Sequence, residues 1–290
     1  MSSLPPQPEP SAVADRPICV FDSGLGGLTV VRELMASMPA ENVVYLADTA
    51  RVPYGIKSLE TVRRFARQNA SFLMGFDPKV MVVACNTASA AAFEDLQDRL
   101  PVPVVDVIRP GVRATLEAVD GPVGVIGTEA TVDSGAYQRR IAQADPSRAV
   151  HARPCPLLVP IVEEGRRDDD PIVLNVLCDY LRDLQRARVE AIILGCTHYP
   201  LLAGPIGKLM GPEVRLINSG RAAALEVQAL LCSNNQVRST DHRGRLTCFT
   251  TDKPERFTNL AERFGGRKPD SVDFVGTDEL EVRAVPDRQA

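Results

Sequence analysis

The chain has 290 residues, 44% of them hydrophobic, so it can bury a full core and has room for two domains. Its formal net charge is −4 and its basic residues form no long stripe, so we expect no nucleic-acid partner. No apolar run approaches the roughly 18 residues that span a bilayer, and the Pro-rich start lacks the basic and apolar regions of a signal peptide, so we expect a cytoplasmic protein that does not bind membranes.

The predicted elements alternate between strands and helices. A disordered arm is expected over residues 1–16 and a loose tail over 278–290. Apolar runs of strand length occur at 18–22, 43–48, 80–85, 102–107, 122–128, 189–198, 214–220, 245–251 and 271–276. Helical patterns occur at 58–76, 87–100, 171–187, 221–231 and 254–264. Near-continuous apolar strands that alternate with helices are typical of a doubly wound α/β fold with parallel sheets.

The two halves of the chain share one local plan. Residues 79–87 and 190–198 each contain a charged residue, an apolar strand, a small residue, and then a cysteine followed by polar residues. We therefore expect two similar α/β lobes with the active site in the cleft between them. Functional residues should gather at the carboxyl ends of the strands.

Seven cysteines, an odd number, argue against a disulfide framework. Two of them, Cys85 and Cys196, end strong strands and precede predicted helices, whose N-termini should lower the thiol pKa. The other five are expected to be packing residues: Cys19, Cys155, Cys178, Cys232 and Cys248.

Two thiols on opposite sides of a cleft can move a proton from one face of a carbon atom to the other. One thiolate removes the proton, and the opposite thiol delivers another. A metal site made by Cys85, Cys196 and His198 is the competing interpretation. It is weaker, because a Cys-x-His spacing is unusual for zinc and no fourth ligand suggests itself.

Asp22 ends the first strand, where a carboxylate is costly without a partner. It could orient or deprotonate a thiol or bind a substrate ammonium group; alternatively, Asp22 or Ser23 caps the next helix. The glycines that follow form only part of a dinucleotide fingerprint, because Thr29 occupies the third glycine position, although Asp48 lies at a suitable distance for a ribose contact.

Three other features are candidates. The Pro/Gly loop 48–55 could bind a ligand through its backbone N–H groups, or be only a turn. His198, two residues after Cys196, could hold the proton of that thiol. Glu163 follows an apolar stretch, but with Glu164 beside it the start of a surface helix explains it equally well.

Two segments resemble the cysteine signatures of the aspartate/glutamate racemase superfamily: VVACNTASA at 82–90 and IILGCTHYP at 192–200. Five further blocks resemble glutamate racemases in the expected order, at 21–30, 45–55, 125–131, 155–165 and 248–257. The resemblance covers residues 17 to 265. It implies interconversion of L- and D-glutamate without a cofactor, supply of D-glutamate for peptidoglycan, and a homodimer. It also implies a first lobe of residues 17–109 plus 219–277 and a second lobe of 110–218.

By motif position, the resemblance implies that Cys85 acts on D-glutamate with help from Asp22, and Cys196 on L-glutamate with help from His198. The residues implied in substrate binding are Ser23, Pro53, Tyr54, Gly55, Asn86, Thr87, Thr128 and Thr197. Asp48, Glu163 and Thr131 are further candidates with less defined roles. One departure from the family pattern is Asn218, where an aspartate is expected.

Three alternatives stay open. An aspartate racemase is the nearest one, although such relatives tend to carry an acidic residue where this chain has His198. A pyridoxal-dependent racemase needs a Schiff-base lysine, and none of the five lysines lies in a suggestive turn. A binding or regulatory module is the third, because some glutamate racemases also bind gyrase.

Overall fold

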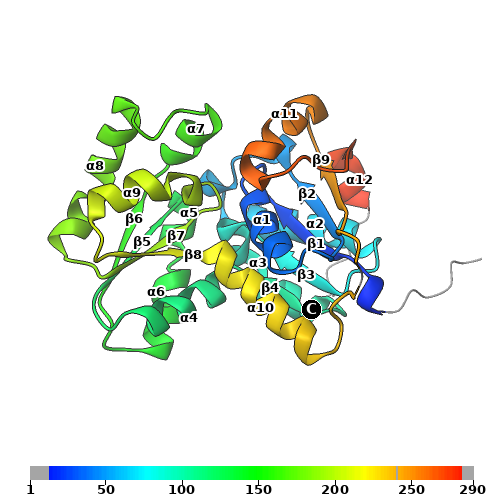
Figure 1. Cartoon of the computed structure of the whole chain (residues 1–290), viewed down its shortest axis with the longest axis horizontal. Helices are drawn as coiled ribbons and strands as arrows, with labels where there is room; N and C mark the ends of the chain where they lie inside the picture. The colour runs from blue at the N-terminus through cyan, green and yellow to red at the C-terminus, as the bar shows by residue number, and fades with distance from the viewer. Residues whose placement is uncertain (1–12, 240, 283–290) are drawn as a thin grey trace, which may run out of the picture.

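The computed structural model describes residues 13–239 and 241–282. The strands form two parallel sheets that lie side by side in Figure 1. The first sheet contains β1 (Ile18–Asp22), β2 (Val43–Ala47), β3 (Val80–Val83), β4 (Val104–Asp106), β9 (Leu246–Thr250) and β10 (Ser271–Phe274). The second contains β5 (Val123–Gly127), β6 (Val150–Pro154), β7 (Ala191–Gly195) and β8 (Arg215–Asn218).

The strand order of the second sheet matches that of four strands in the first, β2-β1-β3-β4. The first runs β10-β9-β2-β1-β3-β4 and the second β6-β5-β7-β8, so in each the earliest strand lies between its two successors. After β1 the chain adds β2 on one side of it and then β3 on the other, and after β5 it adds β6 and β7 in the same way. This makes both sheets doubly wound, as predicted, and creates a topological switch point at β1/β3 and at β5/β7. Ligands of open α/β sheets bind at such points, beyond the carboxyl ends of the strands.

Helices cover both sheets (Figure 1). They are α1 (Leu28–Ser37), α2 (Leu59–Met74), α3 (Asn86–Arg99), α4 (Ile108–Ala118), α5 (Glu129–Asp133), α6 (Ala136–Ala144), α7 (Leu158–Glu163), α8 (Pro171–Arg186), α9 (Ala203–Met210), α10 (Ser219–Ser233), α11 (Pro254–Gly265) and α12 (Thr277–Val282). Local sequence sets several of their starts. Ser58 accepts a hydrogen bond from the Thr61 N–H at 3.3 Å before α2, and Asp170 accepts one from Ile172 at 2.8 Å before α8.

The chain passes between the sheets twice, through α4 after β4 and through α10 after β8. Asn218 starts the second passage: its Oδ1 accepts hydrogen bonds from the N–H groups of Gly220 and Arg221 at 3.0 and 3.2 Å. Its Nδ2 donates to Glu33 Oε1 on α1 at 3.5 Å. Asn218 thus caps the helix as the expected aspartate would. It differs from an aspartate in that its amide donates to the Glu33 carboxylate, which an aspartate would repel.

The expectation that five cysteines serve packing is right for Cys19, Cys155 and Cys248, which are buried, and wrong for Cys178 and Cys232, which are exposed. On α8 the buried positions are Val173, Leu177, Leu181 and Leu184, so the next position along the chain, Cys178, points away from that apolar stripe.

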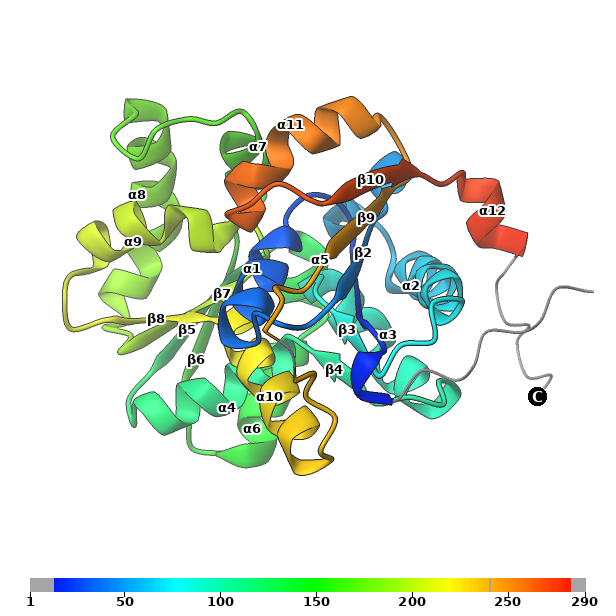
Figure 2. The same cartoon turned by 45° about the vertical axis from the view of Figure 1, so that its right-hand side comes forward.

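Some residues of the expected arm and tail have regular structure. Residues 1–12 of the expected arm lie outside the described residues, but Val13–Asp15 form a 3₁₀ turn, and Lys79 Nζ donates to the Ala14 carbonyl at 2.8 Å. The tail is helical to Val282 as α12, which lies beside α2 in Figure 2 and buries Leu280 completely. Residues 283–290 lie outside the described residues. In the part of the chain that the structure describes, no helix is long and apolar enough to span a membrane.

Candidate active site

A cavity of about 350 Å³ opens where the carboxyl ends of β1, β3, β5 and β7 converge. The structure brings most of the predicted site residues to its wall: Ser23, Pro53, Tyr54, Gly55, Cys85, Asn86, Thr87, Thr128, Glu163, Cys196, Thr197 and His198. Asp22, Asp48 and Thr131 lie outside the wall. Sequence reasoning missed a largely apolar set of wall residues: Gly24, Val52, Ile56, Glu129, Pro156, Val159 and Pro160. All of them lie within or directly beside the segments that resemble glutamate racemases, yet only the folded chain shows which of them face the cavity.

Cys85 is the N-cap residue of α3 and is almost fully buried. The backbone N–H of Ala88 donates to its Sγ at 3.4 Å, and the thiol donates to Ser23 Oγ at 3.8 Å. The strand β3 ends two residues earlier, so the turn from strand to helix directs this thiol to the cavity.

Cys196 follows β7 directly and begins a chain of polar contacts. Its Sγ lies 3.9 Å from His198 Nδ1, and His198 Nε2 lies 3.1 Å from Glu163 Oε1 on α7. The Phe264 ring, from α11, packs edge-on with the imidazole, with ring centroids 5.5 Å apart. The hydrogen bond with His198 is the main cause that lowers the pKa of Glu163.

The expected lowering of the thiol pKa values is wrong. Burial raises the pKa of Cys85 to about 12 and raises that of Cys196 further above its usual range. The Ala88 N–H at the start of α3 does lower the Cys85 value, but removal of a thiolate from water costs more than one such donor returns. In the protein alone, both thiols are therefore protonated at neutral pH.

Asp22 lies behind the cavity wall and is completely buried. Its Oδ2 accepts hydrogen bonds from the N–H groups of Gly24 and Gly27, both at 3.0 Å, while Oδ1 has no partner among the described residues. Burial raises the pKa of this carboxyl. The helix α1 begins after Gly27, so neither Asp22 nor Ser23 caps it, and the capping alternative is wrong.

Of the glycines after β1, Gly26 allows close contact between the two halves of the molecule. A Cβ atom on Gly26 would lie 2.1 Å from Thr197 Oγ1 and 2.5 Å from His198 Nδ1. Thr29 Oγ1 donates to the Thr197 carbonyl at 2.8 Å. The absence of a side chain at Gly26 thus allows the β1–α1 loop to press against the loop that carries Cys196.

Asp48 organises the loop that follows β2. It accepts hydrogen bonds from Arg51 Nε at 2.8 and 2.9 Å, from the Tyr54 hydroxyl, and from Thr251 Oγ1 at 3.2 Å. Both carboxylate oxygens of Asp48 are therefore bonded to protein groups. The structure gives no support to a contact between Asp48 and the ribose of a dinucleotide. The loop places Gly55 so close to Thr128 that a Cβ atom there would lie 2.7 Å from the Thr128 Cβ.

Three threonine hydroxyls form a triangle at the cavity. Thr87 Oγ1 lies 3.0 Å from Thr128 Oγ1 and 3.1 Å from Thr131 Oγ1, and the last two are 2.9 Å apart. Thr87 is on α3 and the other two are at the start of α5, so the triangle joins segments that follow different sheets. Thr131 reaches the site only through this triangle.

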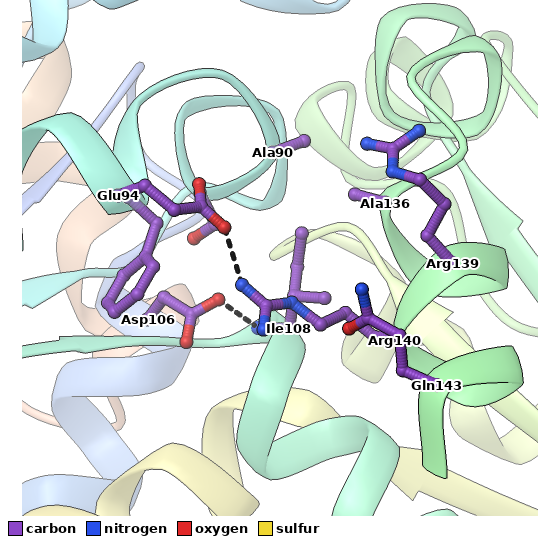
Figure 3. Close-up of a pocket in the computed structure, with 10 residues that line it drawn as sticks. Ala90, Glu94, Asp106, Ile108, Ala136, Arg139, Arg140 and Gln143 are labelled. Carbon is purple, nitrogen blue, oxygen red and sulfur yellow. Dashed lines mark hydrogen bonds and ion pairs between the residues drawn. The ribbon is translucent and has the colours of Figure 1, made fainter. Parts of the chain in front are cut away.

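A second cavity of about 290 Å³ lies between α3 and α6 and contains none of the predicted site residues. Glu94 and Arg140 face each other across it in Figure 3, with Arg140 Nη2 2.5 Å from Glu94 Oε1. Over residues 13–239 and 241–282, no group of three or more His, Cys, Asp or Glu side chains has a geometry that could hold a metal ion.

Comparison with known proteins gives the class to which this fold and this pair of thiols belong. A family model described as Asp/Glu/Hydantoin racemase matches residues 28–227. The chain therefore belongs to the Asp/Glu racemase family.

Several relatives are similar over nearly their whole length. The glutamate racemase of Geobacter metallireducens is 47% identical over 252 residues, which cover 87% of this chain and 93% of that protein. The crystal structure of the Francisella tularensis glutamate racemase in complex with D-glutamate has a TM-score of 0.85 and 38% identity, and covers 91% of this chain and 99% of that one. The Thermus thermophilus glutamate racemase in complex with β-chloro-D-alanine has a TM-score of 0.83 and 46% identity, and covers 92% of this chain and 99% of that one.

Proposed function

We propose that this protein interconverts L- and D-glutamate through proton transfer by Cys85 and Cys196. The observation that carries the proposal is the pair of cysteines at matching strand ends of two similar sheets, both at the wall of one cavity. The names of relatives at 37–47% identity support glutamate as the substrate.

In this mechanism one cysteine, as thiolate, takes the proton from the α-carbon, whose bonding pair stays on the carbon as a planar carbanion. The thiol of the other cysteine donates its proton to the opposite face, which inverts the centre and leaves that sulfur as thiolate. By the family resemblance, Cys85 acts on the D-enantiomer and Cys196 on the L-enantiomer.

The thiolate has to form against the cost of burial, because desolvation raises the pKa of both thiols. The ammonium group of an amino-acid substrate would bring a positive charge into the cavity and offset part of this cost. Asp22 is proposed to assist Cys85. His198, 3.9 Å from Cys196 and bonded to Glu163, is proposed to hold the proton of the second thiol.

Substrate carboxylates need hydrogen-bond donors, since the cavity wall holds no lysine or arginine among the described residues. The threonine hydroxyls at 87 and 128 and the amide of Asn86 are such donors. Ser23, Thr197 and the loop residues Pro53, Tyr54 and Gly55 complete the proposed substrate contacts. Asp48 and Thr131 are proposed to position the loop and the threonines.

The test is racemisation of each glutamate enantiomer in D2O, followed by circular dichroism and mass spectrometry. The product should gain solvent deuterium at the α-carbon, and Cys85→Ala and Cys196→Ala should each abolish racemisation. Cys178→Ala, at an exposed cysteine, is the matched control and should retain wild-type activity. Full activity in either active-site variant would refute the two-thiol mechanism, and turnover of aspartate alone would refute the substrate.

The remaining expectations stay predictions. The division into a lobe of 17–109 plus 219–277 and a lobe of 110–218 is supported by the membership of the strands in the two sheets. Homodimer formation is tested by sedimentation equilibrium and cytoplasmic location by cell fractionation. Supply of D-glutamate for peptidoglycan is tested by depletion of the protein and rescue of growth with D-glutamate.

A further inference from the structure

Tyr137 was not singled out by its sequence, yet it touches the chain beside both cysteines. It lies on α6 and is completely buried. Its hydroxyl donates to Asn86 Oδ1 at 2.6 Å, and Asn86 directly follows Cys85. Tyr137 comes after the strand β5 of the second sheet, whereas Asn86 begins the helix that follows β3 of the first. The bond therefore joins the two halves of the molecule immediately next to the cavity.

The other half of the Asn86 amide is unsatisfied. Asn86 is only 3% exposed, and its Nδ2 has no hydrogen-bond partner among the described residues. Buried donors are nearly always paired, so a partnerless one at a cavity wall marks a place for an acceptor from a ligand. Because the Tyr137 hydroxyl engages Oδ1, the amide offers its N–H groups, and not its oxygen, for that purpose.

The ring of Tyr137 also lies against the strand that carries the second thiol. A Cβ atom on Gly195, the residue before Cys196, would lie 3.2 Å from Tyr137 Cε2. The aromatic ring thus occupies the space that a side chain at 195 would need. Tyr137 therefore bonds to Asn86, the residue after Cys85, and lies against Gly195, the residue before Cys196.

We propose that Tyr137 is a positioning residue, which holds the Asn86 amide so that Nδ2 donates to a carboxylate of the substrate. The proposal rests on the proposed racemase function. Without the hydroxyl the amide is free to turn its oxygen towards the cavity, where it would repel the carboxylate. The loss concerns binding of the substrate more than proton transfer, so KM should change more than kcat.

The test compares Tyr137→Phe with wild type on both glutamate enantiomers. Tyr137→Phe should raise KM about tenfold, the effect of one lost neutral hydrogen bond near the upper end of its usual range, with a smaller change in kcat. Asn86→Ala should raise KM at least as much. The double variant should match Asn86→Ala alone, because the hydroxyl has no amide left to orient.

Arg140→Ala is the matched control, because the Arg140–Glu94 ion pair (Figure 3) joins the same two helices, α3 and α6, through side chains that do not bond to the Asn86 amide. It should leave KM at the wild-type value. An equal rise of KM in Arg140→Ala, an unchanged KM in Tyr137→Phe, or multiplied effects in the double variant would overturn the proposal.

If thermal unfolding shows that Tyr137→Phe does not fold, Asn86→Asp gives a second test. It keeps an acceptor for the Tyr137 hydroxyl but replaces the Nδ2 donor with a second acceptor, so KM should rise as in Asn86→Ala. A wild-type KM in Asn86→Asp would equally overturn the proposal. Failure of the proposed function itself would be distinct, because wild-type protein would then not racemise glutamate.

Discussion

Gly26→Ala would test whether the β1–α1 loop sets the position of His198. The added Cβ would lie 2.1 Å from Thr197 Oγ1 and 2.5 Å from His198 Nδ1, and contacts that short are not found in real structures. The imidazole cannot simply turn aside, because Glu163 holds its Nε2 at 3.1 Å and Phe264 packs against the ring at a centroid distance of 5.5 Å. One methyl group therefore has to push the two loops apart.

Before the atoms reach 3.4 Å, the lower limit of ordinary van der Waals contact, the required displacement is about 0.9 Å for His198 Nδ1 and about 1.3 Å for Thr197 Oγ1. A misplacement of about 1 Å in a catalytic group can cost about 100-fold in rate, so kcat/KM should fall by about this factor. Overpacking of this kind costs about 1–3 kcal/mol of folding free energy, which leaves the protein folded under assay conditions. The loss of activity should thus greatly exceed the loss of folded protein.

The assay is racemisation kinetics in both directions, together with urea unfolding. Gly207→Ala is the matched control, because Gly207 lies inside α9 and a Cβ there meets only Leu216 Cδ1, at an ordinary 3.7 Å. It should keep wild-type activity and gain about 0.4–1 kcal/mol of stability. If Gly26→Ala keeps activity within about threefold of wild type, the inferred role of the contact in placing His198 is wrong.

Four further predictions concern charged and titrating groups. Because burial raises the pKa of Cys85 to about 12, its alkylation by iodoacetamide, located by mass spectrometry, should accelerate about tenfold per pH unit from pH 7 to 10; a flat rate would contradict this. Asp48→Ala leaves the largely buried Arg51 without its carboxylate partner, although its bonds to Gln68 and Asn69 remain, and should cost about 3 kcal/mol in urea unfolding, with a raised KM; an unchanged unfolding midpoint would count against it. Glu163→Gln should lower kcat/KM about fivefold, because the partly exposed bond between Glu163 and His198 contributes only about 1 kcal/mol. The decrease should be equal in both directions, because the two enantiomers have equal free energy. The hydrogen bond with His198 lowers the pKa of Glu163, so it contributes its full stability above the ordinary pKa of a glutamate. This stability is lost as the pH falls through the lowered pKa. In Glu163→Gln that loss of stability at acid pH should be absent.

The sequence by itself determined the fold class and the position of the two thiols. Short β-branched runs and amphipathic helices are local patterns, and their alternation leaves few arrangements other than parallel sheets covered on both faces. Carboxyl ends of parallel strands meet at one edge of a sheet, so the places of Cys85 and Cys196 in the sequence are enough to separate them from the other cysteines. For the cavity-wall residues next to these strand ends, such as Asn86 and Thr197, the prediction came from the family resemblance.

The tertiary structure decided how these groups are solvated and which partners they have. The prediction of lowered thiol pKa values was wrong because it took account only of the helix N-termini, which the sequence shows. The pKa values are raised by desolvation, which depends on atoms that both halves of the chain bring around each thiol. Asp48 proved to be a partner of Arg51, because side-chain pairing within a loop depends on how the loop folds.

The contacts across the cavity were equally beyond the sequence. Three contacts join residues that are far apart in the chain: Gly26 with His198, Thr87 with Thr128, and Tyr137 with Asn86. Neither the periodicity of the sequence nor the spacing of its motifs predicts such contacts, because they form only when the two sheets pack together. The chain thus specifies locally which groups can do the chemistry, and the packing of its two halves fixes how those groups are held.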